Sequence, residues 1–315
     1  MTRRARWGVA GALAAALAIL VPWALGGRAP DYSSLGTVDL SLAATAQPGT
    51  TLERVHLTSS AGRRLECHLR RPLGSGRTAS VPAVLLFGGI GTGGRAAMLV
   101  DPSLPVVVLA CDYPWADPSR SPWWRILWRA PAIRADVLAT PRALSLASSF
   151  VLGLPGVDRE RFVGIGASLG VPFVSAWAAE DQRVRAVALV YGGGDLGVLF
   201  EANLQRRVGA RWLRQVAATL GAALLRALDP ARTAPRIAPR PLLLIGSEED
   251  ERVPRASVET LTRAARAPVT IVRLEGRHMM PRDTTLLRAI GDSVVGWLDR
   301  VLAPLSQSGP RGHLR

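Results

Sequence analysis

The chain has 315 residues, of which 48% are hydrophobic and 5% aromatic, and its 39 basic against 24 acidic side chains give a formal charge of +15. This length and apolar content allow a buried core and exclude a disordered chain. Two cysteines exclude a disulfide scaffold and a zinc site made of cysteines alone, and four scattered histidines leave little for metal ligation. The absence of lysine excludes P-loop phosphate chemistry, Schiff-base catalysis and pyridoxal-phosphate attachment.

Residues 1–28 are predicted to be a signal peptide or a membrane anchor. Arginines among the first six residues precede an uncharged apolar run from Trp7 to Leu25, which is barely long enough to span a bilayer. Ala24 and Gly26 offer small residues for cleavage, and a buried N-terminal helix is the remaining alternative. Positive charge before the run predicts a body outside the cytoplasm, either membrane-anchored or secreted.

The remainder of the chain is predicted to be a linker over 29–49, one domain over 50–304 and a disordered tail over 305–315. Within the domain, β-rich runs alternate with helical stretches, and several runs are continuously apolar, as in parallel strands covered on both faces. The alternation predicts a mostly parallel α/β sheet. The predicted strands are Leu52–Thr58, Leu65–Arg70, Ala83–Phe87, Val106–Cys111, Phe162–Ile165, Val184–Val190, Leu242–Ile245 and Val269–Leu274, and the predicted helices are Arg134–Val151, a segment after Ser168, Arg255–Ala265 and Thr284–Leu302.

One stretch interrupts this alternation. Residues 196–234 form a long, arginine-rich helical insert between two predicted strands, where a simple crossover would be shorter. We interpret the insert as a helical cap over one edge of the sheet. An elongated crossover pair of helices with a solvated arginine face is the alternative.

A nucleophile motif follows the predicted strand Phe162–Ile165. The residues Gly166-Ala167-Ser168-Leu169-Gly170 have the pattern G-x-S-x-G, which is typical of a strained strand-to-helix turn that exposes a serine hydroxyl above a sheet. Glycines are needed at both ends because a side chain there would collide with the neighbouring strand or helix. The motif therefore predicts Ser168 as a nucleophile.

An activated serine needs a base and a group that orients the base. Only His278 and His313 follow Ser168, and His313 lies in the terminal tail. His278 comes directly after the predicted strand Val269–Leu274, where a loop can bring an imidazole over the sheet edge. We therefore predict His278 as the base; a purely structural histidine is the alternative.

The orienting acid is expected beyond the preceding strand, Leu242–Ile245. There the residues from Asp250 to Pro254 have the pattern D-x-x-V-P. With the nucleophile motif before it and His278 after it, this pattern resembles the α/β-hydrolase superfamily, and in particular serine hydrolases of the dienelactone-hydrolase or prolyl-oligopeptidase type. The resemblance covers roughly residues 52–302. It implies the α/β-hydrolase fold, with a mostly parallel eight-stranded sheet flanked by helices.

The resemblance also implies residue roles. By the family pattern Asp250 is the acid of the triad, and we interpret Glu248, Glu249 and Glu251 as a solvated charged turn. Because the second and fourth strands of this fold are adjacent, Cys67 and Cys111 are expected to be close together. They form either a disulfide or two independent buried thiols.

Two backbone N–H groups are expected to stabilise the developing oxyanion. One belongs to Leu169, the residue after the nucleophile. The other is expected in the glycine-rich loop after Ala83–Phe87, where Gly89 is the predicted donor and Ile90 the next candidate. This loop lacks the G-x-G-x-x-G spacing of a dinucleotide site, which argues against nucleotide binding.

These features predict a serine hydrolase that cleaves an acyl ester, thioester or amide through an acyl-enzyme, with no metal or organic cofactor. One alternative is a catalytically silent hydrolase-fold protein that serves as a binding or envelope-structural module. The short Gly-Gly start of the oxyanion loop also resembles acyl-CoA thioesterases related to bile-acid acyltransferases. The expected partner is therefore a small-molecule acyl substrate.

Two surface features remain open. The segment 122–129 holds three tryptophans and two arginines, and it is interpreted as an acyl-pocket wall, a membrane-interface segment or an ordinarily packed loop helix. The charge of +15 predicts attraction to an anionic membrane surface or an acidic polymer. No nucleic-acid motif accompanies it, so no nucleic-acid partner is expected.

Overall fold

A computed structural model describes residues 27–42, 47–73, 80–89, 91–115, 122, 125, 128–205 and 208–306. The predicted signal peptide or anchor thus lies almost wholly outside the described residues, as does the predicted tail beyond residue 306. Across the described ranges, no helix has the length and apolar character needed to cross a membrane.

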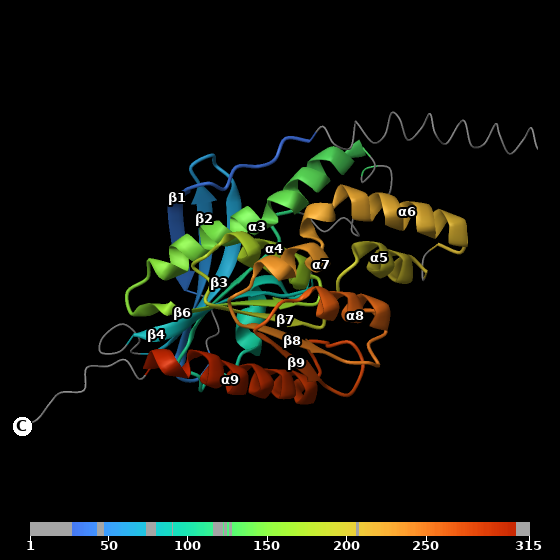
Figure 1. Ribbon diagram of the computed structural model, residues 1–315. Coiled ribbons are helices and arrows are strands. Elements are labelled where there is room, and N and C mark those ends of the chain that lie inside the picture. Colours follow the sequence, from blue (N-terminus) through green and yellow to red (C-terminus); the bar gives the residue numbers. More distant parts are fainter. Residues whose placement is uncertain are drawn as a thin grey trace, which may run out of the picture.

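A nine-stranded sheet forms the centre of the fold (Figure 1). Its strand order is β1-β2-β3-β5-β4-β6-β7-β8-β9, with antiparallel pairing from β1 to β5 and parallel pairing from β5 to β9. The mostly parallel sheet predicted from the sequence is confirmed, and all eight predicted strands are present. The strands are β1 Leu35–Leu42, β2 Thr50–Ser59, β3 Arg64–Pro72, β4 Val81–Phe87, β5 Val107–Cys111, β6 Val157–Ala167, β7 Ala186–Val190, β8 Leu242–Gly246 and β9 Val269–Arg273.

The ninth strand, β1, corrects the prediction of a linker over 29–49. Its backbone pairs with β2 along the edge of the sheet, so its stability comes from main-chain hydrogen bonds. Leu35 and Val38 pack on the core, but Leu40 and Leu42 are exposed. The alternation of Val38, Leu40 and Leu42 with polar residues is a strand signal that the linker prediction did not use.

Helices cover both faces of the sheet (Figure 1). On one face lie α3 (Ala130–Leu152), α4 (Gly170–Glu180) and the short α7 (Pro230–Thr233), with α8 (Arg255–Ala264) beside α7. The opposite face is covered by α9 (Thr284–Ser306) and by the 3-10 helix η1 (Gly93–Leu99). Pro131 lies at the first turn of α3, where a missing N–H is tolerated.

The insert over residues 196–234 is helical, as predicted. Its elements are α5 (Leu196–Leu204), α6 (Arg211–Leu224), η3 (Arg226–Leu228) and α7, with η4 (Ala234–Arg236) following. The helices α5 and α6 pack against each other beyond the end of the sheet, next to α7 and α8 (Figure 1). Asp195 caps α5 by accepting hydrogen bonds from the backbone N–H groups of Gly197 and Val198. Because α5 begins soon after the end of β7, it lies over the carboxyl ends of the strands.

A disulfide joins the antiparallel part of the sheet to its parallel part. Cys67 in β3 and Cys111 in β5 are direct cross-strand partners, and their sulfur atoms are bonded. Of the two arrangements left open by the sequence, the structure thus has the disulfide.

Candidate active site

The Ser168 turn lies between β6 and α4. Ser168 has a φ of +53°, a left-handed conformation that is strained for a residue with a side chain. Its N–H donates to the Val190 carbonyl on β7 at 2.8 Å. A Cβ at Gly170 would lie 1.9 Å from the Phe87 carbonyl oxygen, and one at Gly166 would lie 2.8 Å from a carbon of α4. The glycines therefore permit the close approach that the turn requires.

His278 and Asp250 lie beside Ser168. In the sequence, His278 is 110 residues from Ser168 and 28 residues from Asp250. The Ser168 Oγ is 2.8 Å from His278 Nε2, and His278 Nδ1 is 2.8 Å from Asp250 Oδ2. Both side chains of the His278–Asp250 pair are 2% exposed. Asp250 Oδ1 accepts the backbone N–H groups of Arg252 and Val253 at 2.8 and 3.0 Å, which orients the carboxylate.

The other carboxylates of the 248–251 loop have different surroundings. Glu248 pairs with Arg273 on the exposed side of β9. Glu251 accepts the backbone N–H of His278 at 2.9 Å, and this hydrogen bond is the main reason why the pKa of Glu251 falls to about 2. Glu251 is exposed, as expected for a solvated turn, and it has a further role that the sequence did not indicate. It fixes the backbone of His278, whereas Asp250 fixes the imidazole ring.

Tyr191 supports the other side of the imidazole. Its ring lies edge-on to His278, with centroids 5.8 Å apart. Its backbone has a φ of +54°, and its N–H donates to the Ile245 carbonyl at 2.7 Å. Burial and the nearby carboxylates of Asp250 and Asp283 raise the pKa of Tyr191 to about 12, so its hydroxyl stays neutral. Neither Tyr191 nor Glu251 carries a sequence signal for this position.

The glycine-rich loop after β4 runs close to Ser168. A Cβ at Gly89 would be 4.0 Å from the Ser168 Cβ. Within the described residues, the N–H groups of Gly89 and Leu169 donate to no other residue. The Gly89 carbonyl accepts the N–H of Thr92 at 2.9 Å. Ile90, the alternative donor, lies outside the described residues.

A tyrosine that the sequence did not indicate holds this loop. Tyr113 follows β5, and its hydroxyl donates to the Gly88 carbonyl at 2.8 Å. Burial raises the pKa of Tyr113 well above its ordinary value, which keeps the phenol protonated as a donor. Asp112 adds a second anchor by accepting the N–H of Gly94 at 2.9 Å.

The comparison with known proteins rests on structure, since no family model and no curated protein matches this sequence. The acetyl xylan esterase 1 of Thermoanaerobacterium sp. JW/SL YS485 is 15% identical and superimposes with a TM-score of 0.58 over 84% of this chain and 88% of its own. The acetyl xylan esterase of Paenibacillus sp. R4 is 16% identical and superimposes with a TM-score of 0.62 over 84% of this chain and 89% of its own.

A cold-adapted esterase from an Arctic intertidal metagenomic library is 18% identical, with a TM-score of 0.53 over 83% of this chain and 99% of its own.

The chain has the α/β-hydrolase fold. In this fold the carboxyl ends of the parallel strands meet at one edge, where ligands of open α/β sheets bind. Ser168, Asp250 and His278 follow β6, β8 and β9 at that edge.

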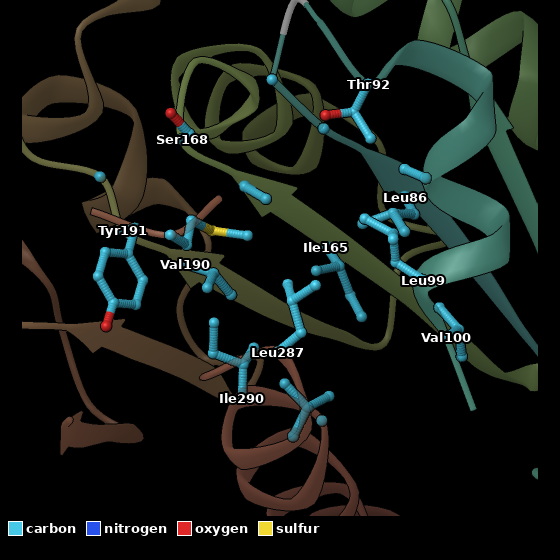
Figure 2. Close-up of a pocket in the computed structure, with 18 of the residues that line it drawn as sticks. Leu86, Thr92, Leu99, Val100, Ile165, Ser168, Val190, Tyr191, Leu287 and Ile290 are labelled. Carbon is cyan, nitrogen blue, oxygen red and sulfur yellow. The ribbon is translucent and has the colours of Figure 1, made fainter. Parts of the chain in front are cut away.

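A large cavity opens at the same edge of the α/β-hydrolase fold (Figure 2). Its volume is about 1920 Å³, and Ser168 and His278 are part of its wall. Ligand pockets commonly have about 300–1,000 Å³, so this cavity has room for more than a small acyl group. Leu196, Leu199 and Phe200 of the insert contribute to the wall, which supports the interpretation of α5 as a cap.

Other predicted features lie away from this site. Most of the tryptophan-rich segment 122–129 falls outside the described residues, and its described Trp128 is 80% exposed. In the part of the chain that the structure describes, no three His, Cys, Asp or Glu side chains gather as a metal site would require.

Proposed function

We propose that this protein is a serine hydrolase that cleaves acyl esters through a Ser168–His278–Asp250 triad and an acyl-enzyme intermediate. The observation that carries the proposal is the continuous hydrogen-bond chain from the Ser168 hydroxyl through both ring nitrogens of His278 to Asp250. The structural likeness to esterases supports the ester as substrate class.

In the acylation step, the Ser168 oxygen attacks the carbonyl carbon of the ester, and its proton passes to His278 Nε2. Asp250 accepts the Nδ1–H bond, which leaves Nε2 unprotonated and ready to take that proton. The N–H groups of Gly89 and Leu169 are proposed to bind the negatively charged carbonyl oxygen. Removing one such donor typically costs about 10²–10³-fold in kcat.

The tetrahedral intermediate then expels the alcohol, which leaves with the proton from His278, and the acyl group remains on the Ser168 oxygen. A water molecule attacks this ester while His278 takes its proton, and the acid is released as Ser168 regains its hydrogen. The reaction thus consumes one water and needs no other reactant.

Two other functions compete with this proposal. A silent binding module would have no need for a strained serine conformation and an oriented imidazole, both of which cost stability or space. An acyl-CoA thioesterase or acyltransferase would use the same nucleophile with another leaving group or acceptor. Comparing an oxygen ester with a thioester of the same acyl chain separates this function from simple ester hydrolysis.

The decisive experiment is labelling and turnover of Ser168→Ala. We expect the variant to lose fluorophosphonate labelling and to lose about 10⁶-fold in kcat toward a short 4-nitrophenyl ester, as nucleophile removal does in a comparable triad. Ser149→Ala is the matched control, because Ser149 lies on the surface of α3 and should change neither readout. Residual activity of Ser168→Ala within tenfold of wild type would exclude the proposed nucleophile.

We further propose that the folded domain works outside the cytoplasm, either secreted or membrane-anchored. The Cys67–Cys111 disulfide supports this, because disulfides persist in oxidising compartments and are rare in the cytosol. Non-reducing peptide mapping of the natively expressed protein tests the bond, and N-terminal sequencing distinguishes a cleaved signal from a retained anchor. Two free thiols would contradict the compartment.

An anionic membrane surface is the proposed partner of the insert. The helix α6 has no acidic residue and exposes Trp212, Leu213 and Val216 beside Arg211. This combination suits an interface where aromatic and basic side chains meet lipid headgroups. Sedimentation with vesicles of phosphatidylglycerol, with Trp212→Ser as the variant and phosphatidylcholine vesicles as the control, tests it. Equal binding to both lipids would contradict the proposal.

A further inference from the structure

The cavity continues from Ser168 along the α9 face of the sheet (Figure 2). Leu86, Ile165 and Val190 extend from the strands toward α9, and Leu287 and Ile290 extend from α9 toward the sheet. Apolar residues after and within η1 form a further part of the wall, namely Leu99, Val100, Pro102 and Leu104. The nucleophile therefore lies where the α9 side of the cavity meets the part under the insert, and the α9 side is a channel whose walls are mainly apolar.

The helix α9 carries two apolar stripes rather than the one that packing requires. Leu286, Ile290, Val294 and Trp297 are buried against the sheet. A second stripe lines the cavity at helical spacing, and its members are Leu287, Gly291, Val295, Leu298 and Leu302. The second stripe is only partly covered by protein, so it offers apolar surface to a ligand.

Two independent walls agree on the length of the channel. Both Ser168 and Arg161 line the cavity, and the seven residue steps of extended chain between them span roughly 23 Å at about 3.3 Å per step. On the other wall, Leu287 to Leu302 spans roughly 22 Å at 1.5 Å per residue of helix. The channel is therefore much longer than a short acyl group.

We propose that this channel binds a long, unbranched acyl chain of the ester, with its carbonyl carbon at Ser168 and its methyl end toward Arg161 and Leu302. The inference rests on the proposed ester hydrolysis and assigns its substrate class. An apolar, extended ligand fits because apolar side chains from the strands, η1 and α9 predominate along the channel. The charged side chains in the wall are Asp101, Arg161, Arg252, Arg288, Asp292 and Asp299.

A segment of the chain's own N-terminus is a weaker occupant. The described chain begins at Gly27, which packs closely on the start of α3, because an added Cβ there would collide with the Pro131 carbonyl. This helix covers the opposite face of the sheet from α9 (Figure 1). A channel that begins at the candidate nucleophile instead matches a substrate that must reach the Ser168 oxygen.

The first test is the chain-length profile of the wild-type protein. We compare 4-nitrophenyl acetate, octanoate and palmitate, all dispersed in the same non-ionic detergent. Each methylene transferred from water to an apolar wall should raise kcat/KM by about fourfold until binding saturates. We therefore expect kcat/KM for palmitate to exceed that for acetate by roughly a hundredfold or more.

The second test fills the channel from α9. A Cβ at Gly291 would meet no atom within 4 Å, so a tryptophan can be placed there without a clash at its first carbon. Gly291→Trp should lower kcat/KM for octanoate and palmitate by about tenfold or more and change that for acetate by less than about twofold. Leu298→Trp lies deeper and should affect palmitate alone.

A matched variant controls for side effects. Arg300→Trp places the same indole on an exposed position of α9 that does not line the cavity. It should keep the wild-type profile. Acetate turnover by each variant shows that it is folded and active, and Leu298→Trp replaces Gly291→Trp if the latter loses acetate turnover.

The outcomes separate the two proposals. If no ester is hydrolysed and no fluorophosphonate label is bound, the proposed function fails. If acetate is hydrolysed but kcat/KM falls steadily with chain length, or if both tryptophan variants keep the wild-type profile, the acyl channel is wrong while the hydrolase stands. A depth-dependent loss of the longer esters supports the channel.

Discussion

The two faces of the sheet are covered in different ways. On the α3 and α4 face, large side chains pack closely. Trp177 is fully buried, its ring centroid is 5.9 Å from that of Phe162, and Leu144 belongs to the same buried cluster. On the α9 face, one stripe of the helix is buried, and a long cavity is lined by the second stripe together with Ile290 and Val294 of the buried one. One face is filled and the other is partly hollow.

This difference separates stability from binding. Close packing gains dispersion and hydrophobic energy at every contact, whereas a cavity forgoes those contacts along its walls. Ser168, Asp250 and His278 belong to neither face, because they lie on loops at the edge where the two faces meet. A substrate bound on the hollow face can therefore reach the loops without disturbing the filled face.

The largest expected effect lies at this edge. Asp250→Asn should lower kcat by about 10⁴-fold, because an amide cannot hold the His278 tautomer that accepts the serine proton. The variant should keep the wild-type order of preference among acyl chains, which the α9 face determines. Steady-state kinetics with acetate and palmitate esters measure both quantities.

Glu248→Gln and Glu249→Gln are the controls for Asp250, since neither carboxylate contacts His278 in the structure. Each should change kcat by less than about tenfold. If the Glu248 or Glu249 variant lost most of its kcat while Asp250→Asn kept its own, the acid of the triad would be misassigned.

The second effect concerns the filled face. Trp177→Ala should lower the free energy of unfolding by about 3–5 kcal/mol, because it empties a closed site and removes the indole N–H from Asp181. The specific activity of the folded fraction should be unchanged. Denaturant unfolding measures the loss of stability. Trp212→Ala is the control, because Trp212 is 58% exposed on α6. Equal losses for both variants would contradict the picture of a closely packed face.

The sequence predicts the filled face better than the hollow one. Apolar runs such as Leu242–Ile245 are local signals, so the eight predicted strands and the main helices lie close to their observed bounds. Strand β6 begins at Val157, five residues earlier than predicted, because Asp158, Arg159, Glu160 and Arg161 give it a polar start. The cavity, in contrast, depends on the distance between α9 and the sheet, which no local pattern encodes.

The candidate site divides in the same way. Ser168 and His278 were predicted from a motif and from chain order, and Asp250 from the family pattern; the structure brings the three within hydrogen-bonding distance. Their catalytic roles stay predictions. Glu251 and Tyr113 were missed because each acts through a backbone atom 25 or more residues away, and backbone partners leave no trace in residue type.

The third prediction tests how Glu251 holds the edge. The pKa of Glu251 is lowered from 4.5 to about 2, chiefly by the His278 backbone N–H, so the ionised carboxylate is favoured in the folded state. Its contribution to stability is fully present above about pH 4.5 and is lost as the pH falls through about 2. Glu251→Gln should therefore be less stable than wild type at pH 7 by about 1 kcal/mol, allowing for solvent screening.

The gap between Glu251→Gln and wild type should close as the pH falls from 4.5 toward 2, which thermal unfolding over this range measures. Glu249→Gln controls for the loss of one charge in the same loop. A gap that stays constant with pH would mean that the Glu251 carboxylate does not contribute through its charge.

The smallest expected effects give the sharpest comparison, because one substitution is made on each face. A Cβ at Gly164 would lie 2.6 Å from the Trp177 ring, so Gly164→Ala should overpack the filled face and cost about 1–3 kcal/mol. At Gly291 a Cβ meets no atom within 4 Å, and the residue lies inside α9. There the methyl group only restricts the unfolded chain and favours the helix, so Gly291→Ala should stabilise the protein by about 0.5–1 kcal/mol. Denaturant unfolding of both variants reads the sign directly. Destabilisation by both would mean that the α9 face is as closely packed as the other, and the cavity beside Ser168 would then be too small for a long acyl chain.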